Sequence, residues 1–375
     1  MIECWLDRSV AQLSIPTCCH LSYQGADRAV FQVRALDCAD VRGNRGSGNL
    51  KKRWAKMRAS VTFAVKAAIS GLLLYLALDF VNLDTLRGRM SEIEWPWILA
   101  AFAVMAVQLG LVSLRWQQIA LACGTKLSRR TAFLYMVIAS FFNQMLPSTI
   151  GGDAARIWLV AHHRSGWKGA VYSVLIDRGA GLLWLALIVL ACLPWSLNSI
   201  PNPVGRITLI AISAASIAGI VALFTIDRSR RWLTRWRLTR HLAEIASVTW
   251  RVLTWRRIGF AVAVLSVIGH FLTALTAWCV ARAIGSSLDL VEALLLILPV
   301  VLIASIPISI AGWGVREAAM VTAFVYAGLP RDDGLLVSLL IGVESFAMGA
   351  VGGLTWVLSG EQIKPPHKVA AAHPR

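Results

Sequence analysis

Six long apolar runs dominate this sequence. They lie at residues 61–78, 97–114, 170–194, 207–226, 258–281 and 335–358. A membrane-spanning helix needs about 20 mostly apolar residues, so we interpret each run as a full crossing. Two further apolar stretches, 131–163 and 291–328, are interrupted by Pro and Gly near their middles. Only 15% of the residues are charged, against about 25% in soluble domains. The sequence therefore predicts an all-α polytopic membrane protein.

The charged residues between the runs predict how the chain is oriented. The net charge is +17, which is one signature of nucleic-acid binding. The basic residues are spread between the apolar runs, however, as in membrane proteins with positively charged cytoplasmic loops. The loop 227–257 holds nine Arg and two acidic residues, and Arg115 follows the second run in another predicted cytoplasmic loop. We expect a bacterial cytoplasmic membrane protein with both termini in the cytoplasm and no nucleic-acid partner.

Residues outside the runs predict the remaining organisation. Residues 1–56 are polar and have no steady periodicity. They indicate either a disordered segment or an extension ahead of a true start at Met57. We expect a first membrane repeat over 57–200, a second over 201–360 and a cytoplasmic tail over 361–375. The seven Cys residues include no CxxC pair, so we expect no disulfide framework, metal or cofactor.

The two interrupted stretches carry the same motif. Residues 147–156 and 307–316 both read P-x-[ST]-I-[GA]-G-x-x-x-R. Each half of the chain reads span, span, interrupted stretch, span. Flanking charges place both ends of the first stretch in the cytoplasm and both ends of the second outside. The pattern predicts six full spans plus two re-entrant helical hairpins in an inverted-topology repeat, the plan of many transporters.

The chemistry of the motif favours an anion. Pro and Gly break a helix, and broken backbone at membrane depth is tolerated only inside protein or beside a wet cavity. A helix that restarts after the glycines directs free N–H groups at that cavity, and an Arg one turn later matches phosphate. We therefore expect a phosphate or an anionic headgroup to be bound here. The predicted binding residues are Arg156, Arg316, Asp153, Glu317, Asn143, Gln144, Gly151, Gly152, Gly312 and Gly314.

Most of these residues also have a structural interpretation. Arg156 and Arg316 would pair with Asp153 and Glu317, or either acid would cap a helix amino terminus. Asn143 and Gln144 either line the cavity or bond neighbouring helices.

Other polar residues fall inside the later runs. Asp177 and Arg178 fit a structural ion pair better than a proton relay. Glu344 lies deeper in its span and is the better candidate for proton coupling, while His270 fits a bond to a neighbouring helix.

Three segments resemble a known family. They are NQMLPSTIGGDAARIWLV (143–160), LIDRGAGLL (175–183) and PISIAGWGVREAAMV (307–321). They are similar to the lysylphosphatidylglycerol synthetase/flippase membrane-domain family, over about residues 57–360. The resemblance implies a flippase for an aminoacylated or otherwise modified phospholipid, and some relatives are linked to polyprenyl-phosphate glycan chemistry. Larger members carry a soluble aminoacyltransferase domain. This chain ends at Arg375 without one, so we expect no synthase activity.

Three functions therefore stand as alternatives. The first is a flippase for an anionic lipid, served by a separate lipid-modifying enzyme and with self-association left open. The second is a membrane-embedded transferase acting on a lipid-linked phosphate, for which Asp153, Asp177 and Glu317 are the candidate acids or bases. The third is a non-catalytic envelope scaffold, in which Arg156 and Arg316 are replaceable.

Overall fold

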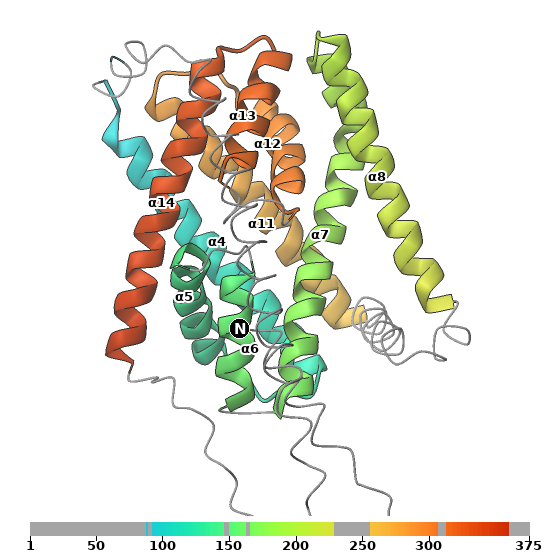
Figure 1. Ribbon diagram of the computed structural model, residues 1–375, viewed down its shortest axis with the longest axis vertical. Coiled ribbons are helices and arrows are strands. Elements are labelled where there is room, and N and C mark those ends of the chain that lie inside the picture. Colours follow the sequence, from blue (N-terminus) through green and yellow to red (C-terminus); the bar gives the residue numbers. More distant parts are fainter. Residues whose placement is uncertain are drawn as a thin grey trace, which may run out of the picture. The chain divides into compact units, whose positions relative to one another are not determined.

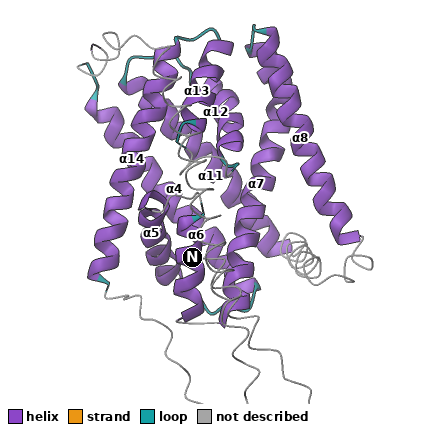
Figure 2. Ribbon diagram, viewed as in Figure 1, coloured by secondary structure: helices purple, strands orange, loops and turns teal. Residues whose placement is uncertain are grey.

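The computed structural model describes Gly88 and residues 92–145, 150–162, 166–228, 256–306 and 313–359. The chain divides into two compact units, Met1–Lys66 and Ala67–Arg375, and every described residue lies in the second. The predictions for residues 1–56, the run 61–78, the tail 361–375 and most of the loop 227–257 lie outside the described residues. The described part is helical and contains no strand (Figure 2).

Five long apolar helices confirm five of the six predicted runs. They are α4 (Trp95–Ala122), α7 (Gly166–Ser199), α8 (Pro203–Arg228), α11 (Arg256–Ala283) and α14 (Arg331–Leu358). Each is long and apolar enough to cross a membrane. Two of these helices start with a proline, which lies in the first turn of α4 and is the first residue of α8. The fixed φ of proline suits a helix amino terminus, and its missing N–H costs nothing there. The five helices indicate a multi-pass membrane protein.

Four shorter helices occupy the two interrupted stretches. The first stretch forms α5 (Arg129–Met145) and α6 (Gly151–Val160), and the second forms α12 (Leu290–Ala304) and α13 (Val315–Tyr326). None reaches the roughly 20 residues of a full span. Helix α5 ends at Met145, before the first motif, and α12 ends at Ala304, before the second, as the Pro residues of the motifs predict.

The first short helix of each half packs against the last helix of the other half (Figure 1). Helix α5 lies against α14, and α12 lies against α7. Within the first half α6 contacts α7, and within the second half α13 contacts α14. Between the halves, α4 packs along α11. Gln108 joins α4 to α11, because its amide nitrogen donates to Gly269 O at 3.1 Å and to Thr273 Oγ1 at 2.6 Å. Such bonds stabilise helix pairs that no hydrophobic effect drives together in lipid.

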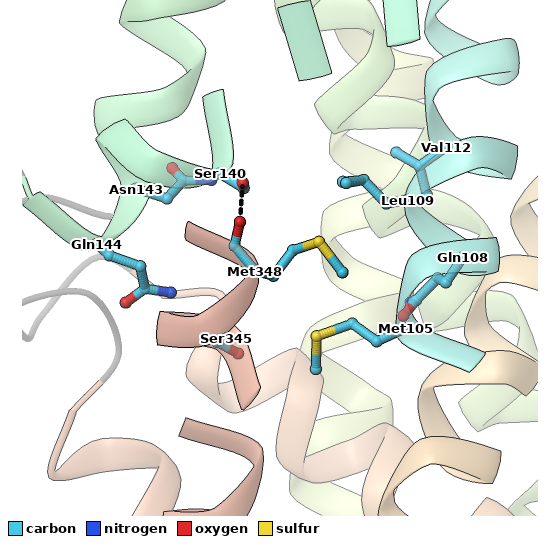
Figure 3. Close-up of a pocket in the computed structure, with 9 residues that line it drawn as sticks. All are labelled: Met105, Gln108, Leu109, Val112, Ser140, Asn143, Gln144, Ser345 and Met348. Atoms are coloured by element: carbon cyan, nitrogen blue, oxygen red, sulfur yellow. Dashed lines mark hydrogen bonds between the residues drawn. The ribbon is translucent and has the colours of Figure 1, made fainter. Parts of the chain in front are cut away.

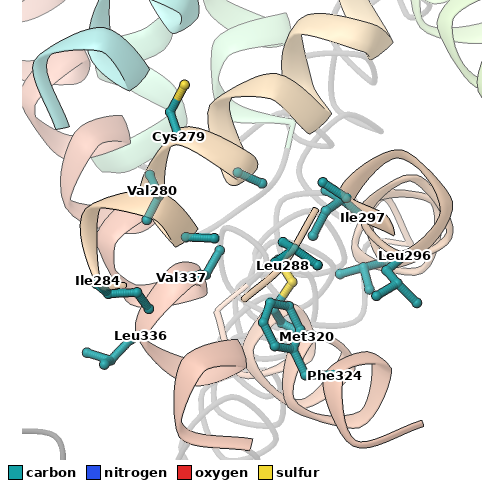
Figure 4. Packing of buried hydrophobic residues seen from close by; sticks show 14 of the residues in the cluster. Cys279, Val280, Ile284, Leu288, Leu296, Ile297, Met320, Phe324, Leu336 and Val337 are labelled. Carbon is teal, nitrogen blue, oxygen red and sulfur yellow. The ribbon is translucent and has the colours of Figure 1, made fainter. Parts of the chain in front are cut away.

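The largest buried cluster joins the helices of the second half (Figure 4). Val280 of α11, Ile297 of α12, Phe324 of α13 and Val337 of α14 meet there. Phe324 is fully buried. The packing positions α13, which carries the second motif, against α14.

Candidate functional site

The first motif leads into helix α6. A side chain of α5 makes a hydrogen bond to the amino terminus of α6. The N-cap residue Ile150 offers no side-chain cap; instead, Gly152 N donates to Asn143 Oδ1 at 2.8 Å. A Cβ atom on Gly152 would lie 2.5 Å from Ala139 O and 2.6 Å from Asn143 Oδ1. Glycine is therefore required for the close approach of α5 and α6. Asn143 makes the cross-helix bond that was one of its two predicted roles.

Five charged residues form the first cluster, which joins α4, α6 and α7. Arg156 donates from Nη2 to Asp153 Oδ1 and from Nη1 to Asp177 Oδ2, the latter at 3.0 Å. Arg115 Nε donates to Asp177 Oδ1 at 2.9 Å. Arg178 Nε donates to Asp153 Oδ2 at 2.6 Å. All four carboxylate oxygens are thus bonded, and the predicted Arg156–Asp153 pair is confirmed.

The first cluster is buried at one end and accessible at the other. The side chains of Arg156 and Asp177 are 4% and 2% exposed, whereas that of Arg178 is 49% exposed. Three arginines and two aspartates leave one formal positive charge. The four buried members pair off as two arginines and two aspartates, so the surplus charge is that of half-exposed Arg178, which can attract a further anion. Arg178 is the member that such an anion reaches first.

Two neutral residues fix the arginines of the first cluster. The ring of Trp116 lies under the Arg156 guanidinium, with 5.0 Å between Cζ and the ring centroid. An arginine in this position is attracted by the negative face of the ring. Arg115 Nη1 donates to Ser266 Oγ of α11 at 3.2 Å. These contacts hold both guanidinium groups without adding negative charge.

The second motif builds a cluster around Glu317, which is fully buried. Its Oε2 accepts from Gly314 N at 2.6 Å, and its Oε1 accepts from Arg316 Nη2 at 2.7 Å and from the Ser338 hydroxyl at 3.0 Å. Gly314 has a φ of +83°, a backbone conformation that favours glycine. We call Gly314, Arg316, Glu317 and Ser338 the second cluster. The predicted Arg316–Glu317 pair and the predicted Glu317 cap are both confirmed.

Asp153 does not act as a helix cap, so that alternative is wrong for the first motif. Both of its oxygens accept from guanidinium groups, and Asn143 bonds the start of α6 in its place. The two arginines also differ in position. Arg156 is one turn into α6, as expected, but Arg316 is in the first turn of α13, because that helix starts only after Trp313-Gly314. Gly312 lies outside the described residues.

Arg316 is held from several sides. Its Nε donates to Ser338 Oγ at 2.9 Å, and its Cζ lies 5.1 Å from the centroid of the Trp313 ring. A Cβ atom on Gly342 of α14 would lie 2.8 Å from its Nη2. The side chain is 20% exposed. Within the described residues, Nη1 donates to no partner, so one face of the guanidinium is available to a ligand.

A pocket of about 240 Å³ lies between α4, α5 and α14 (Figure 3). Its polar lining residues are Gln108, Ser140, Asn143, Gln144 and Ser345. Met105, Leu109, Val112 and Met348 complete the lining, so no charged side chain contributes. We call it the amide pocket. Asn143 and Gln144 both line this pocket, and their role in binding an anion stays a prediction.

Glu344 lies on α14 beside Ser345 of the amide pocket. It is buried, and neither carboxylate oxygen has a hydrogen-bond partner in the part of the chain described. Nothing here tests its predicted role in proton coupling. Asp177 and Arg178, in contrast, make the structural ion pairs that were expected of them. His270 bonds Gly181 O of α7 at 3.0 Å, as its position in a span predicts.

Sequence reasoning missed Arg115, Trp116 and Gln108. The sequence predicts that the second run ends at residue 114, because a basic residue after an apolar run is typical of a cytoplasmic loop. Helix α4 continues to Ala122, and Arg115 points into the protein, where it is buried. The signal was present in Ile119 and Ala120, fully buried residues that continue the helical spacing of apolar side chains. Among the described residues, no three His, Cys, Asp or Glu side chains lie close enough to hold a metal.

The described helices and clusters define a class of protein. Apolar helices pack around two largely buried charged clusters, each at the start of a short helix. This is a multi-pass α-helical membrane protein with a polar interior.

The family model for the lysylphosphatidylglycerol synthase TM region matches residues 63–353. The chain belongs to this family, and the resemblance noted in its motifs is confirmed. Membership indicates a membrane protein of lipid modification or transport. No curated protein sequence matches the chain.

Proposed function

We propose that this protein is a lipid flippase. It moves an anionic or modified phospholipid, or a lipid-linked phosphate, between leaflets through a midplane site at two re-entrant half-helices. The observation that carries the proposal is the excess positive charge of the first cluster, at the start of a broken helix. Guanidinium groups bind phosphate oxygens in the same forked geometry as carboxylates. A phosphate is therefore a natural further ligand for these arginines.

The bonds of Asp153 suggest how such a ligand enters. Its two oxygens are shared between buried Arg156 and half-exposed Arg178. A phosphate arriving at Arg178 competes with Asp153 Oδ2 for the same donor. Asp153 retains its bond to Arg156, so the exchange strands no buried charge. The first cluster can thus accept and release an anion by swapping one partner.

The second cluster is the candidate for the opposite side of the pathway. One arginine and one glutamate leave it formally neutral, so it attracts an anion less strongly than the first cluster does. Its free donor is Arg316 Nη1, at a guanidinium that is 20% exposed. A strong site and a weaker site on two half-helices suit alternating exposure, because transport requires release as well as binding.

Helix packing supports an inverted repeat as the frame for this mechanism. Helix α5 of the first half contacts α14 of the second, α12 of the second half contacts α7 of the first, and the equivalent helices α4 and α11 pack together. A two-fold relationship between the halves accounts for that exchange. We propose six full spans, with the run 61–78 as the first, plus two re-entrant hairpins. Both termini face the cytoplasm of a bacterial cell.

The rival transferase needs an acid or base free to take part in proton transfer. The three candidates, Asp153, Asp177 and Glu317, all accept hydrogen bonds from arginine. Each is therefore engaged in an ion pair rather than presented to a substrate. The contacts favour transport over transfer chemistry.

Leaflet exchange in proteoliposomes tests the proposal. The purified full-length protein is reconstituted with fluorescent anionic lipids, and exchange is followed by quenching of the outer leaflet. The variant is Arg156→Gln/Arg316→Gln. The matched control is Arg206→Gln/Arg282→Gln, because Arg206 bonds Ile200 O and Arg282 stacks on Trp278, both outside the two clusters. Elution as a single species in size-exclusion chromatography establishes that each variant is folded.

We expect the wild type and the control to exchange lipid, and the folded double variant to lose exchange. Undiminished exchange by the double variant would remove the clusters from the pathway. A wild type that exchanges no lipid but forms a new lipid product in the same vesicles would replace the flippase with the transferase.

A further inference from the structure

Glu344 of α14 is a buried carboxyl that belongs to neither charged cluster. It is 4% exposed, and neither oxygen has a hydrogen-bond partner among the described residues. Asp153, Asp177 and Glu317, in contrast, all accept hydrogen bonds from arginine. A buried carboxylate without a partner is costly, whereas a protonated carboxyl carries no charge. The described conformation therefore favours the protonated form of Glu344.

Along α14, Glu344 lies between the two motifs. Two residues before it, a Cβ atom on Gly342 would lie 2.8 Å from Arg316 Nη2, at the start of α13. Five residues after it, a Cβ atom on Gly349 would lie 3.0 Å from Gln144 Cγ, near the end of α5. These two contacts are about 10 Å apart along the helix axis. A charge on Glu344 would thus appear between the two interrupted stretches.

Helices α5, α11 and α13 pack against α14. Helix α5 meets α14 through uncharged side chains, as at Gln144. Helix α13 brings Arg316 and Glu317, which form an ion pair with each other. Arg316 contacts α14 at Gly342, nearly opposite Glu344 around the helix, because consecutive residues point about 100° apart. The other ionisable residues of α5 and α13 are Arg129, Arg130, Tyr135 and Tyr326.

Helix α11 brings the thiol of Cys279, which interacts electrostatically with Glu344. A thiol is uncharged at neutral pH, so it provides no opposite charge. His270 bonds α7 instead, and Arg282 stacks on an indole ring of α11 itself. The remaining charged residues of α11 are Arg256 and Arg257, at its start. On α14, the nearest charged residue in the sequence is Asp333, about three turns earlier. The described surroundings of Glu344 therefore compensate no negative charge.

A route for a proton begins at the next residue. Ser345 lines the amide pocket, and so does Met348, one turn after Glu344 (Figure 3). The pocket volume of about 240 Å³ is large enough for water. Glu344 itself is not a lining residue. A movement of α14 or of the Glu344 side chain would bring the carboxyl to this pocket.

We propose that Glu344 is a proton-binding site that makes this protein a proton-coupled lipid transporter. An anionic lipid enters while Glu344 carries a proton. The lipid leaves on the other side, where a movement of α14 opens Glu344 to the amide pocket and the carboxyl releases its proton to water. The inference rests on the proposed function, because it supplies the driving force for the same pathway.

The direction of coupling follows from charge. An ionised Glu344 would place an unpaired negative charge between two motifs that bind an anion, and repulsion in a low-dielectric interior is strong. A protonated Glu344 removes that repulsion. Proton and anion therefore favour each other's binding, and by linkage the effect is reciprocal. One proton and one singly charged lipid move together without net charge, so the lipid accumulates in the leaflet that faces the more alkaline side.

Infrared spectroscopy of the full-length protein in micelles tests the proton site without lipid exchange. A protonated carboxyl has a C=O stretch that a carboxylate lacks. We expect such a band at neutral pH, and Glu344→Gln should remove it. Glu94→Gln is the control, because Glu94 is an exposed residue that makes no side-chain cap bond to α4. Absence of the band from the wild type, or its persistence in Glu344→Gln, would overturn the inference.

Lipid exchange in proteoliposomes tests the coupling. The probe is fluorescent phosphatidylglycerol, whose phosphodiester keeps one negative charge from about pH 6 to about pH 9. With equal pH on both sides, wild-type exchange should fall by about tenfold per pH unit once Glu344 ionises, the slope of a single proton. Glu344→Gln should lose this dependence, whereas Glu344→Asp and Glu94→Gln should keep it. Under an imposed pH gradient, the wild type should concentrate the probe on the alkaline side and Glu344→Gln should only equilibrate it.

Several results would overturn the coupling. They are wild-type exchange that does not depend on pH, an unchanged pH dependence in Glu344→Gln, and accumulation on the acidic side. Loss of exchange at every pH in folded Glu344→Gln would also overturn it, because the amide reproduces the neutral carboxyl that lipid entry requires.

The two proposals fail separately. Exchange that ignores pH would remove the coupling and leave the flippase intact. An infrared band that depends on Glu344, in a protein that exchanges no lipid, would support the proton site and reject the flippase.

Discussion

Asn143 Oδ1 accepts the Gly152 N–H at 2.8 Å across the break between α5 and α6. This one bond links the wall of the amide pocket to the helix that holds Asp153 and Arg156. A ligand that bonds the free NH₂ group of Asn143 therefore acts directly on the start of α6. The pocket wall and the arginine-bearing helix are thus joined by a single hydrogen bond.

The close approach of α5 and α6 predicts that Gly152→Ala is destabilising. The added methyl would meet Ala139 O at 2.5 Å, and that carbonyl is part of the α5 backbone and cannot rotate away. We expect the free energy of unfolding to fall by about 1–3 kcal/mol, the usual cost of overpacking. Thermal unfolding in micelles measures the change.

Gly110→Ala is the control for that substitution, because Gly110 lies inside α4 with nothing within 4 Å of an added Cβ. Alanine is the better helix former, so this variant should be unchanged or more stable by about 0.5–1 kcal/mol. Equal stability of the two variants would mean that α5 and α6 are less closely packed than described.

The long helices were predictable because hydrocarbon imposes one rule on every span. The run 207–226, for example, shows the required length of apolar sequence, and α8 follows it closely. The end of α5 before the first motif was predictable from Pro147, because a proline disfavours the helical conformation of the residue before it. The burial of Arg115 was not predictable. A charged residue after an apolar run looks like the start of a loop unless its buried partner, here Asp177, is known.

The unequal burial of the first cluster predicts unequal costs for its arginines. Arg115 pairs with Asp177 in the interior, so Arg115→Gln should lower the free energy of unfolding by about 3 kcal/mol or more. Arg178 is half exposed, and Arg178→Gln should cost at most about 1 kcal/mol. Unfolding by denaturant in micelles compares the two variants. A larger cost for Arg178→Gln would contradict the described burial.

Two buried glutamates should respond in opposite ways to an isosteric amide. Glu317 accepts from Gly314 N, Arg316 and Ser338, so Glu317→Gln should cost about 3 kcal/mol by leaving Arg316 unpaired. Glu344 has no partner among the described residues, so Glu344→Gln should leave stability unchanged or raise it by about 1 kcal/mol. Thermal unfolding of both variants under one condition measures the difference. A marked loss in Glu344→Gln would reveal a partner for this carboxyl.

The site itself was only half visible in the sequence. The repeated motif identified Arg156 and Arg316, because the same residues recur at the same spacing. The amide pocket was not predictable as a pocket, since Gln108 and Ser345 come from helices separated by more than half of the chain. Their proximity depends on the packing of α4, α5 and α14, and no local pattern encodes it.

Gly342 of α14 controls the position of Arg316, and its replacement should slow lipid exchange. A methyl there would lie 2.8 Å from Arg316 Nη2 and 2.8 Å from the Trp313 ring, so the guanidinium, or the ring on which it stacks, must shift. We expect Gly342→Ala to reduce exchange severalfold in proteoliposomes, whereas Gly219→Ala, with open space around its Cβ, should not. If the effect acts through Arg316, adding Gly342→Ala to Arg316→Gln should change little, because substitutions that disrupt one contact are not additive. Fully additive losses would show instead that Gly342 serves exchange by a separate route, such as the packing of α14 against α13.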